Sequence, residues 1–145
     1  MFEQRKSEQY TTFLVAGNVY GIEVTKVQEI VNPIAMTIVP HAPPFVRGLI
    51  NLRGQVATAI GLREMLGFES NNNALSMNLV AFVKGNLVSF LVDEILDVIE
   101  VSKDKYENTP SIIPQNISKF MSAVYKLEDG LLSILDIDKI LYHLR

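Results

Sequence analysis

The sequence predicts a mostly β protein, and two observations carry this prediction. The apolar residues fall in short runs of valine, isoleucine, leucine and phenylalanine separated by glycine or asparagine, which is typical of many short strands. The pattern of runs also repeats along the chain. With 145 residues, of which 48% are hydrophobic, the chain is long enough to fold as one domain without disulfide or metal support.

The strands are predicted from pairs of apolar runs that flank a turn. In chain order these pairs are residues 10–16 with 19–24, 49–52 with 56–60, 79–83 with 87–92, and 124–127 with 131–135. The dipeptides between them are Gly17-Asn18, Arg53-Gly54, Gly85-Asn86 and Asp129-Gly130. Glycine and asparagine tolerate the positive φ of tight turns, and Asp-Gly is the strongest hairpin signal in the chain.

Two short helical segments are also predicted. Residues 62–66 are expected to form one or two helical turns that end at Gly67. Residues 136–144 begin with Asp136, a good N-cap residue, and place their apolar side chains on one helical face. We therefore expect a C-terminal helix that packs back on the strands.

An internal repeat relates the two halves of the chain. An offset of 68 residues places residues 17–24 on 85–92, and an offset of 75 places residues 45–66 on 120–141. In both windows turns fall on turns and apolar positions fall on apolar positions. The repeat predicts two tandem copies of one small β unit.

These two units are expected to span about residues 10–70 and 75–136 of a single domain, residues 1–145. Each unit is marginal for an independent core, so the two should share apolar surface. A pair of small barrels packed face to face would satisfy this requirement and would also remove exposed sheet edges.

Composition excludes several classes of function. Thirteen basic and sixteen acidic residues give a formal net charge of −3, so nucleic acid is not expected as a partner. The chain has no cysteine, and His41 and His143 lie far apart without ligand spacing, so we expect no metal and no cofactor. Neither a secretory signal nor an apolar stretch of membrane-spanning length is present. We expect a cytoplasmic protein without direct membrane insertion.

Residues that could carry catalysis are scarce. The sequence has no nucleophile elbow, no phosphate-binding loop and no dinucleotide fingerprint. Asp136 and Asp138 occur where a helix start favours acidic residues, so capping is favoured over a catalytic carboxylate pair. Asp93 and the acidic residues that follow it have no basic partner in the local pattern, and we interpret them as a solvated face. We therefore expect no enzyme.

A binding function has better support in the first half of the chain. Apolar Val27 and Ile30 flank Glu29, while Arg53 occupies a tight turn from which its guanidinium projects. This guanidinium can pair with a carboxylate of a partner or with Glu29 of the same chain. The residues alone leave these two alternatives level.

Several motifs spread over nearly the whole chain share one resemblance. They are YTTFLV at residues 10–15, YGIEV at 20–24, VQEI at 27–30, PPFVRGLINLRG at 43–54, LVD at 91–93 with DV at 97–98, and LSILDIDKIL at 132–141. Together this set resembles the CheW family of chemotaxis coupling proteins, and the stretch 43–54 is its most diagnostic part.

The resemblance implies a fold and a function. The fold would be two tandem SH3-like five-stranded β-barrel subdomains that share a hydrophobic core, with short helices that include a C-terminal one. The function would be that of an adaptor without catalysis, which binds the regulatory domain of the histidine kinase CheA and the cytoplasmic tip of methyl-accepting chemoreceptors. The alternative is a small β-barrel that binds a metabolite or an oligonucleotide. Such a barrel would present basic and aromatic residues along one face, whereas the aromatic residues of this chain occupy mostly core-like positions.

The resemblance also implies the residues that bind each partner. The receptor-binding residues would be Val27, Glu29, Ile30, Arg53 and Val98. The kinase-binding residues would be Arg47, Gly48 and Glu107. This chain departs from the family in having Gly61 where an aspartate is usual, and Glu107 where relatives often carry a basic residue.

Overall fold

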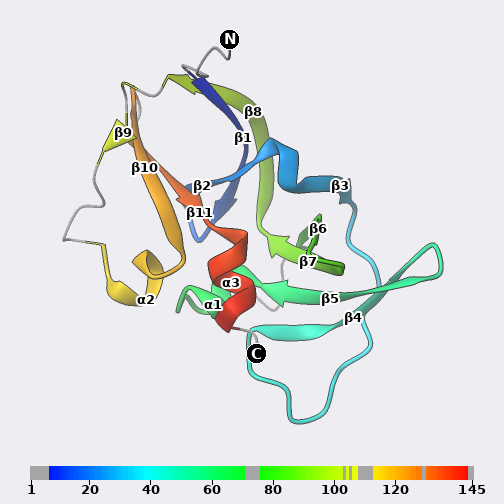
Figure 1. Cartoon of the computed structure of the whole chain (residues 1–145). Helices are drawn as coiled ribbons and strands as arrows, with labels where there is room; N and C mark the ends of the chain where they lie inside the picture. The colour runs from blue at the N-terminus through cyan, green and yellow to red at the C-terminus, as the bar shows by residue number, and fades with distance from the viewer. Residues whose placement is uncertain are drawn as a thin grey trace.

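The computed structural model describes residues 7–70, 76–102, 104, 106–107, 113–128 and 130–143. The first half contains β1 (Ser7–Val15), β2 (Asn18–Glu23), the 3-10 helix η1 (Val24–Lys26), β3 (Val27–Val31), β4 (Val46–Leu52), β5 (Gln55–Gly61) and α1 (Leu62–Met65). The second half contains β6 (Met77–Val83), β7 (Asn86–Val92), β8 (Glu94–Ser102), β9 (Tyr106–Glu107), α2 (Gln115–Ser118), β10 (Met121–Leu127), β11 (Gly130–Leu135) and α3 (Ile137–His143). The mostly β prediction is confirmed (Figure 1).

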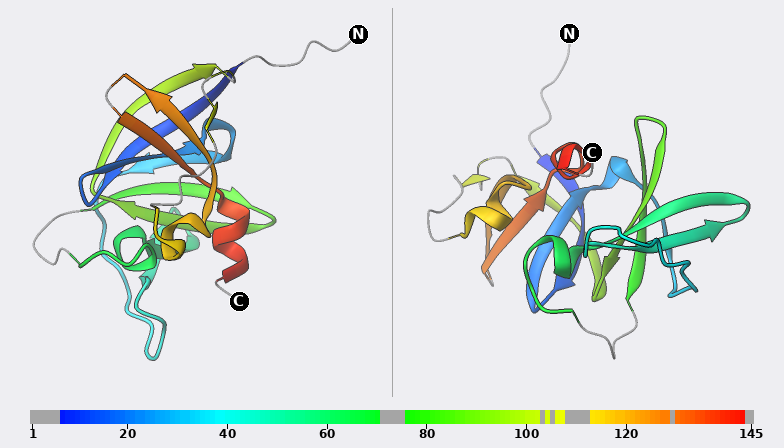
Figure 2. Two further views of the ribbon diagram at one scale, coloured as in Figure 1. Left: turned by 90° about the vertical axis from the view of Figure 1, so that its left-hand side faces the viewer. Right: turned by 90° about the horizontal axis from the view of Figure 1, so that it is seen from below.

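The strands form two separate sheets, each belonging to one SH3-like subdomain. The first has six strands in the order β8-β1-β2-β11-β10-β9, and the second has five in the order β3-β6-β7-β5-β4. We call them the six-stranded and the five-stranded barrel. The six-stranded barrel has one strand more than the five that were expected. The additional strand is the two-residue β9 at the edge of this barrel. Figure 2 shows α3 between the two barrels.

The repeat and the sheets divide the chain differently. The hairpin β1–β2 joins strands of the second half, while the hairpin β6–β7 joins β3, β4 and β5 of the first half. The five-stranded barrel therefore lies within residues 27–92, and the six-stranded barrel combines residues 7–23 with 94–135. Neither barrel coincides with the expected units 10–70 and 75–136, because the two units exchange hairpins.

The repeat nevertheless holds at the level of strand register. Thr11 on β1 pairs with Val98 on β8, and their mates at an offset of 68, Leu79 and Ile30, pair in the five-stranded barrel. A β-bulge follows each pair at the same place. When corresponding hairpins of two similar units are exchanged, each type of local contact is preserved. The sequence pattern is therefore the same with or without the exchange.

The described residues form three hydrophobic clusters. The largest is shared by both barrels and contains Phe13 and Phe90, one from each sheet, together with Ile140 of α3. The interiors of the barrels hold separate clusters, with Leu132 in the six-stranded and Ile50 in the five-stranded barrel. The expected shared core is therefore present, and it joins the two barrels into one packed body.

The tight hairpin turns fall one residue earlier than expected in two cases. Positive φ values mark Ala16-Gly17, Arg53-Gly54 and Lys84-Gly85 as the central turn residues. Asn18 and Asn86, which the sequence pattern placed within turns, instead begin β2 and β7. A turn of this kind needs positive φ at two consecutive residues, and the residue before each glycine takes the first position. The expected Asp129 turn lies outside the described residues.

The C-terminal helix forms as predicted. Asp136 accepts a hydrogen bond from the Lys139 backbone N–H at 3.2 Å, which caps α3, and Ile137 and Ile140 are buried. Among the described residues, no helix combines the length and apolarity that a membrane crossing requires.

Candidate partner-binding surfaces

Arg53 and Glu29 form an ion pair between two edges of the five-stranded sheet. Arg53 lies in the β4–β5 turn and Glu29 on β3, and Nη2 lies 2.6 Å from Oε1. Because β3 and β4 are the opposite edges of this sheet, the pair connects them across the barrel. Of the two alternatives left open by the sequence, the structure contains the intramolecular pair.

The Arg53 guanidinium remains accessible to a partner, since its side chain is 75% exposed. Its backbone has φ +52, a strained conformation for a residue with a Cβ. The side chain of Asn51 supports the turn by accepting a hydrogen bond from the Gly54 N–H at 2.8 Å. Exposed ion pairs contribute little to stability, so Glu29 can give up Arg53 to another carboxylate with a small loss.

Ile30 and Val98 are exposed apolar residues on equivalent edge strands. Their exposed fractions are 45% and 54%. Ile30 pairs with Leu79 of the shared core on β6, and Val98 pairs with Thr11, which precedes Phe13 on the same face of β1. Directly paired residues point to the same side of a sheet, so both side chains lie on the faces turned toward the shared core.

The expected receptor-binding set is brought together only in part. Glu29 and Arg53 touch, and Ile30 follows Glu29 on β3. Val27 is half-buried and packs against the shared core, so it supports β3 more than it offers a free surface. Val98 belongs to the other barrel, on the edge strand β8.

The expected kinase-binding residues lie in two separate places. Arg47 and Gly48 are on β4 of the five-stranded barrel, whereas Glu107 is exposed on β9 of the six-stranded barrel. Figure 1 shows β9 beside β10 on the left and β4 at the lower right. Arg47 is held by Glu64, with Nη1 2.5 Å from Oε1.

Gly48 has a structural reason to be glycine. A Cβ at this position would lie 2.7 Å from the backbone oxygen of Thr37. Thr37 forms an isolated β-bridge with Leu49, with two backbone hydrogen bonds of 2.8 Å. The absence of a side chain at Gly48 therefore allows the preceding loop to lie directly on β4.

Asp93 is not part of a solvated face, and that interpretation of the sequence is wrong. Its carboxylate accepts hydrogen bonds from Arg63 Nε at 2.9 Å and Nη2 at 2.8 Å, and from the Ala16 N–H at 2.8 Å. Burial opposes ionisation, but the hydrogen bonds from Arg63 and Ala16 and the Arg63 charge outweigh it and lower the pKa of Asp93 below its ordinary value. The local pattern missed this partner because Arg63 lies 30 residues away in sequence.

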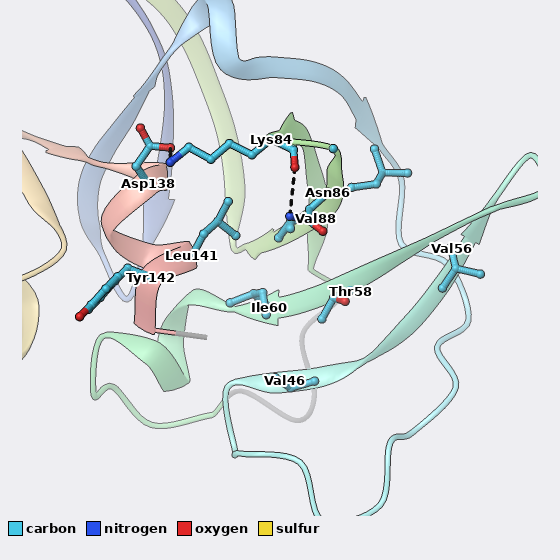
Figure 3. A pocket seen from close by; sticks show the side chains of 12 residues that line it. Val46, Val56, Thr58, Ile60, Lys84, Asn86, Val88, Asp138, Leu141 and Tyr142 are labelled. Carbon is cyan, nitrogen blue, oxygen red and sulfur yellow. Dashed lines mark hydrogen bonds and ion pairs between the residues drawn. The ribbon is translucent and has the colours of Figure 1, made fainter. Parts of the chain in front are cut away.

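A groove that the sequence did not predict lies between α3 and the five-stranded barrel (Figure 3). It has a volume of about 700 Å³. Val56, Thr58 and Ile60 line it from β5, and Leu141 and Tyr142 line it from α3. Lys84 reaches across one side toward Asp138, at 3.9 Å. Its lining is mixed, with Lys84, Asn86 and Asp138 beside the apolar residues. In the part of the chain that the structure describes, no acidic and histidine side chains cluster as a metal site would need.

Comparison with known proteins decides between a chemotaxis coupling protein and an unrelated small ligand-binding barrel. The family model of the CheW-like domain matches residues 9–145. This chain belongs to the CheW family.

Relatives and a solved structure agree with this assignment. The chemotaxis protein CheW of Bacillus subtilis is 31% identical over 140 residues, which cover 96% of this chain and 90% of that protein. The chemotaxis protein CheW of Helicobacter pylori is 29% identical over 134 residues, covering 92% and 81%. The crystal structure of the scaffolding protein TtCheW from Thermoanaerobacter tengcongensis superimposes with a TM-score of 0.80 at 25% identity, covering 89% of this chain and 88% of that chain.

Membership in the CheW family makes this chain a chemotaxis coupling adaptor, as the motifs implied. The small barrel that binds a metabolite or an oligonucleotide is not favoured. The predicted SH3-like pair of barrels with a shared core is confirmed.

The departure from the CheW motif at Gly61 has a local explanation. A Cβ at Gly61 would overlap Glu64 Oε2, so the Glu64 carboxylate occupies the space that an aspartate side chain would need. That same carboxylate pairs with Arg47 and accepts a hydrogen bond from Ser70 Oγ at 2.7 Å. Glu64 is therefore the acidic residue that lies beside Gly61 in this chain.

Gly61→Asp is expected to destabilise the chain when Glu64 is present, because two carboxylates then compete for one space and one arginine. In a Glu64→Ala background the same change is expected to be neutral or stabilising. The coupling energy from urea unfolding of the four proteins should be about 0.5–3 kcal/mol. Additive effects of the two substitutions would contradict this explanation of Gly61.

Proposed function

We propose that this chain joins the cytoplasmic tip of methyl-accepting chemoreceptors to the regulatory domain of CheA and catalyses no reaction itself. The observation that carries the proposal is the position of two arginines, the exposed Arg53 just beyond the end of β4 and the half-buried Arg47 near its start. Surfaces at the two ends of one strand allow both partners to bind at once. Such an adaptor acts in the cytoplasm, within receptor arrays.

The proposed receptor surface combines Ile30 with the pair Glu29–Arg53. An exposed aliphatic side chain beside an exchangeable ion pair suits one face of an amphipathic helix, which presents apolar residues flanked by charges. Val98 would extend this surface onto the six-stranded barrel, and Val27 would support it from below.

The proposed kinase surface is centred on Arg47 and Gly48, where the bridged loop and β4 form one layer. Glu107 is proposed to contact a kinase domain separately, from the edge strand β9 of the other barrel. Two kinase contacts on opposite barrels are the geometry that ring assembly requires, because each adaptor must then touch two neighbours.

Arg53→Glu tests the receptor surface directly. The change reverses the charge and places it beside Glu29, so affinity for a receptor-tip fragment is expected to fall at least about tenfold. Affinity for the CheA regulatory domain and the thermal melting curve should stay unchanged. Isothermal titration calorimetry with each partner measures both affinities.

Lys126→Glu provides the matched control, since Lys126 is exposed on β10 and the charge change is the same. It should leave receptor affinity intact. Undiminished receptor binding by Arg53→Glu, with a normal melting curve, would remove Arg53 from the site. Failure of the unchanged chain to bind either partner would overturn the proposed function itself.

A further inference from the structure

The chain passes from the five-stranded to the six-stranded barrel through one residue, Asp93, which lies between β7 and β8. Its backbone N–H donates a hydrogen bond to the Leu14 carbonyl oxygen of β1 at 2.9 Å. The crossover is therefore bonded to the six-stranded barrel through its main chain. Its side chain forms the contacts to the other barrel.

Those contacts bring together elements of both barrels. Arg63 projects from α1, which directly follows β5 of the five-stranded barrel, and its Nε and Nη2 bind both oxygens of Asp93. Oδ2 of Asp93 also accepts the N–H of Ala16, in the β1–β2 turn of the six-stranded barrel. A further bond runs from Arg63 Nη1 to the Glu69 carbonyl oxygen at 3.0 Å.

This arrangement differs in kind from the apolar packing around it. The shared core attracts the two barrels but is non-directional, whereas a two-pronged guanidinium–carboxylate contact has a fixed geometry. Both side chains are about three-quarters buried, with exposed fractions of 24% and 23%. The contact is therefore less screened by solvent than the Glu29–Arg53 pair.

We propose that Arg63 and Asp93 are positioning residues that fix β8 relative to the five-stranded barrel. β8 begins immediately after Asp93 and carries Val98, while Ile30 lies on β3 of the five-stranded barrel. The Arg63–Asp93 contact thus sets the spacing of the two exposed apolar residues proposed to bind the receptor. The role in receptor binding rests on the proposed function, whereas the role in fixing β8 does not.

A distance measurement tests the positioning role without any partner. The chain has no cysteine, so Gln28→Cys and Val98→Cys place two spin labels on the exposed positions of β3 and β8. Pulsed electron spin resonance should give a narrow distance distribution in this background and a clearly broader one after Arg63→Gln. Asp93→Asn keeps nearly the same side-chain shape and should broaden the distance distribution as well. It serves as the test variant if Arg63→Gln does not fold.

The matched control is Lys84→Gln, which removes the exposed Lys84–Asp138 pair on the outside of the molecule. It should leave the distribution narrow. A distribution as narrow in Arg63→Gln and Asp93→Asn as in the control would overturn the proposal.

Binding measurements separate positioning from general loss of structure. In the chain without labels, Arg63→Gln should weaken receptor-tip binding about tenfold and leave binding of the CheA regulatory domain unchanged. A variant that is merely unstable would lose both affinities together. A broadened distance distribution with full receptor affinity would overturn the link to receptor binding, while failure of the unchanged chain to bind receptor would leave the distance result standing.

Discussion

Phe90→Ala is expected to lower the free energy of unfolding by about 3–5 kcal/mol, the largest effect that we expect from a single truncation. Phe90 is fully buried in the shared core and lies on β7 between Ile60 of β5 and Leu79 of β6. Because the cluster includes both barrels, they should lose stability together. Urea unfolding followed by circular dichroism should therefore remain a single transition at lower urea concentration.

Tyrosine fluorescence provides an independent probe of the same transition. The chain has five tyrosines and no tryptophan, and Tyr10, Tyr20, Tyr106 and Tyr125 all belong to the six-stranded barrel. Coincident midpoints for the two probes would show that the barrels unfold together. Phe82→Ala is the control, because Phe82 is 57% exposed and should lose less than about 1 kcal/mol. Two separated transitions in Phe90→Ala would contradict a shared core that couples the barrels.

Gly48→Ala is expected to have the second-largest effect. The added Cβ would lie 2.7 Å from the Thr37 backbone oxygen and 3.1 Å from Met36 Cβ, so the loop must move away from β4. Overpacking of this kind lowers the free energy of unfolding by about 1–3 kcal/mol, and the two hydrogen bonds between Thr37 and Leu49 are lost in addition. Affinity for the CheA regulatory domain should fall as well.

Hydrogen exchange of the Leu49 amide reports the loop displacement directly. Gly54→Ala is the matched control, since a Cβ at Gly54 meets nothing within 4 Å and only its φ of +88 is unfavourable. It should cost about 1–2 kcal/mol through backbone strain and leave Leu49 protected. Continued protection of Leu49 in Gly48→Ala would show that the loop tolerates a side chain there.

The fold class could be predicted because it depends on local patterns. Short apolar runs, glycine turns and the capped C-terminal segment each act over a few residues. Within the described residues, the three hairpin turns at Gly17, Gly54 and Gly85 and the C-terminal helix appear where the pattern placed them or one residue away. The exchange of hairpins could not be predicted. Thr11 meets Val98 and Leu79 meets Ile30, and the same repeat would result if each unit kept its own hairpin.

In the candidate sites, too, contacts between residues far apart in sequence could not be predicted. The pairing of Arg53 with Glu29 was one of two open alternatives, because sequence spacing does not reveal that opposite sheet edges meet. The contact of Asp93 with Arg63 was missed for the same reason. The contact between Glu64 and Gly61 could have been found in the sequence, because the two residues are three apart at the start of a predicted helix. Since Gly61 has no side chain, the Glu64 carboxylate has room to lie against it.

The hairpin exchange has a consequence for synthesis on the ribosome. Residues 27–92 encode all strands of the five-stranded barrel as one continuous segment, whereas the six-stranded barrel needs residues 7–23 and 94–135. The hairpin β1–β2 therefore emerges before residues 27–92 and waits for its neighbouring strands until residues 94–135 have been made. Such long-range pairing is slow compared with local pairing. The order of translation thus favours completion of the five-stranded barrel before the six-stranded barrel can close.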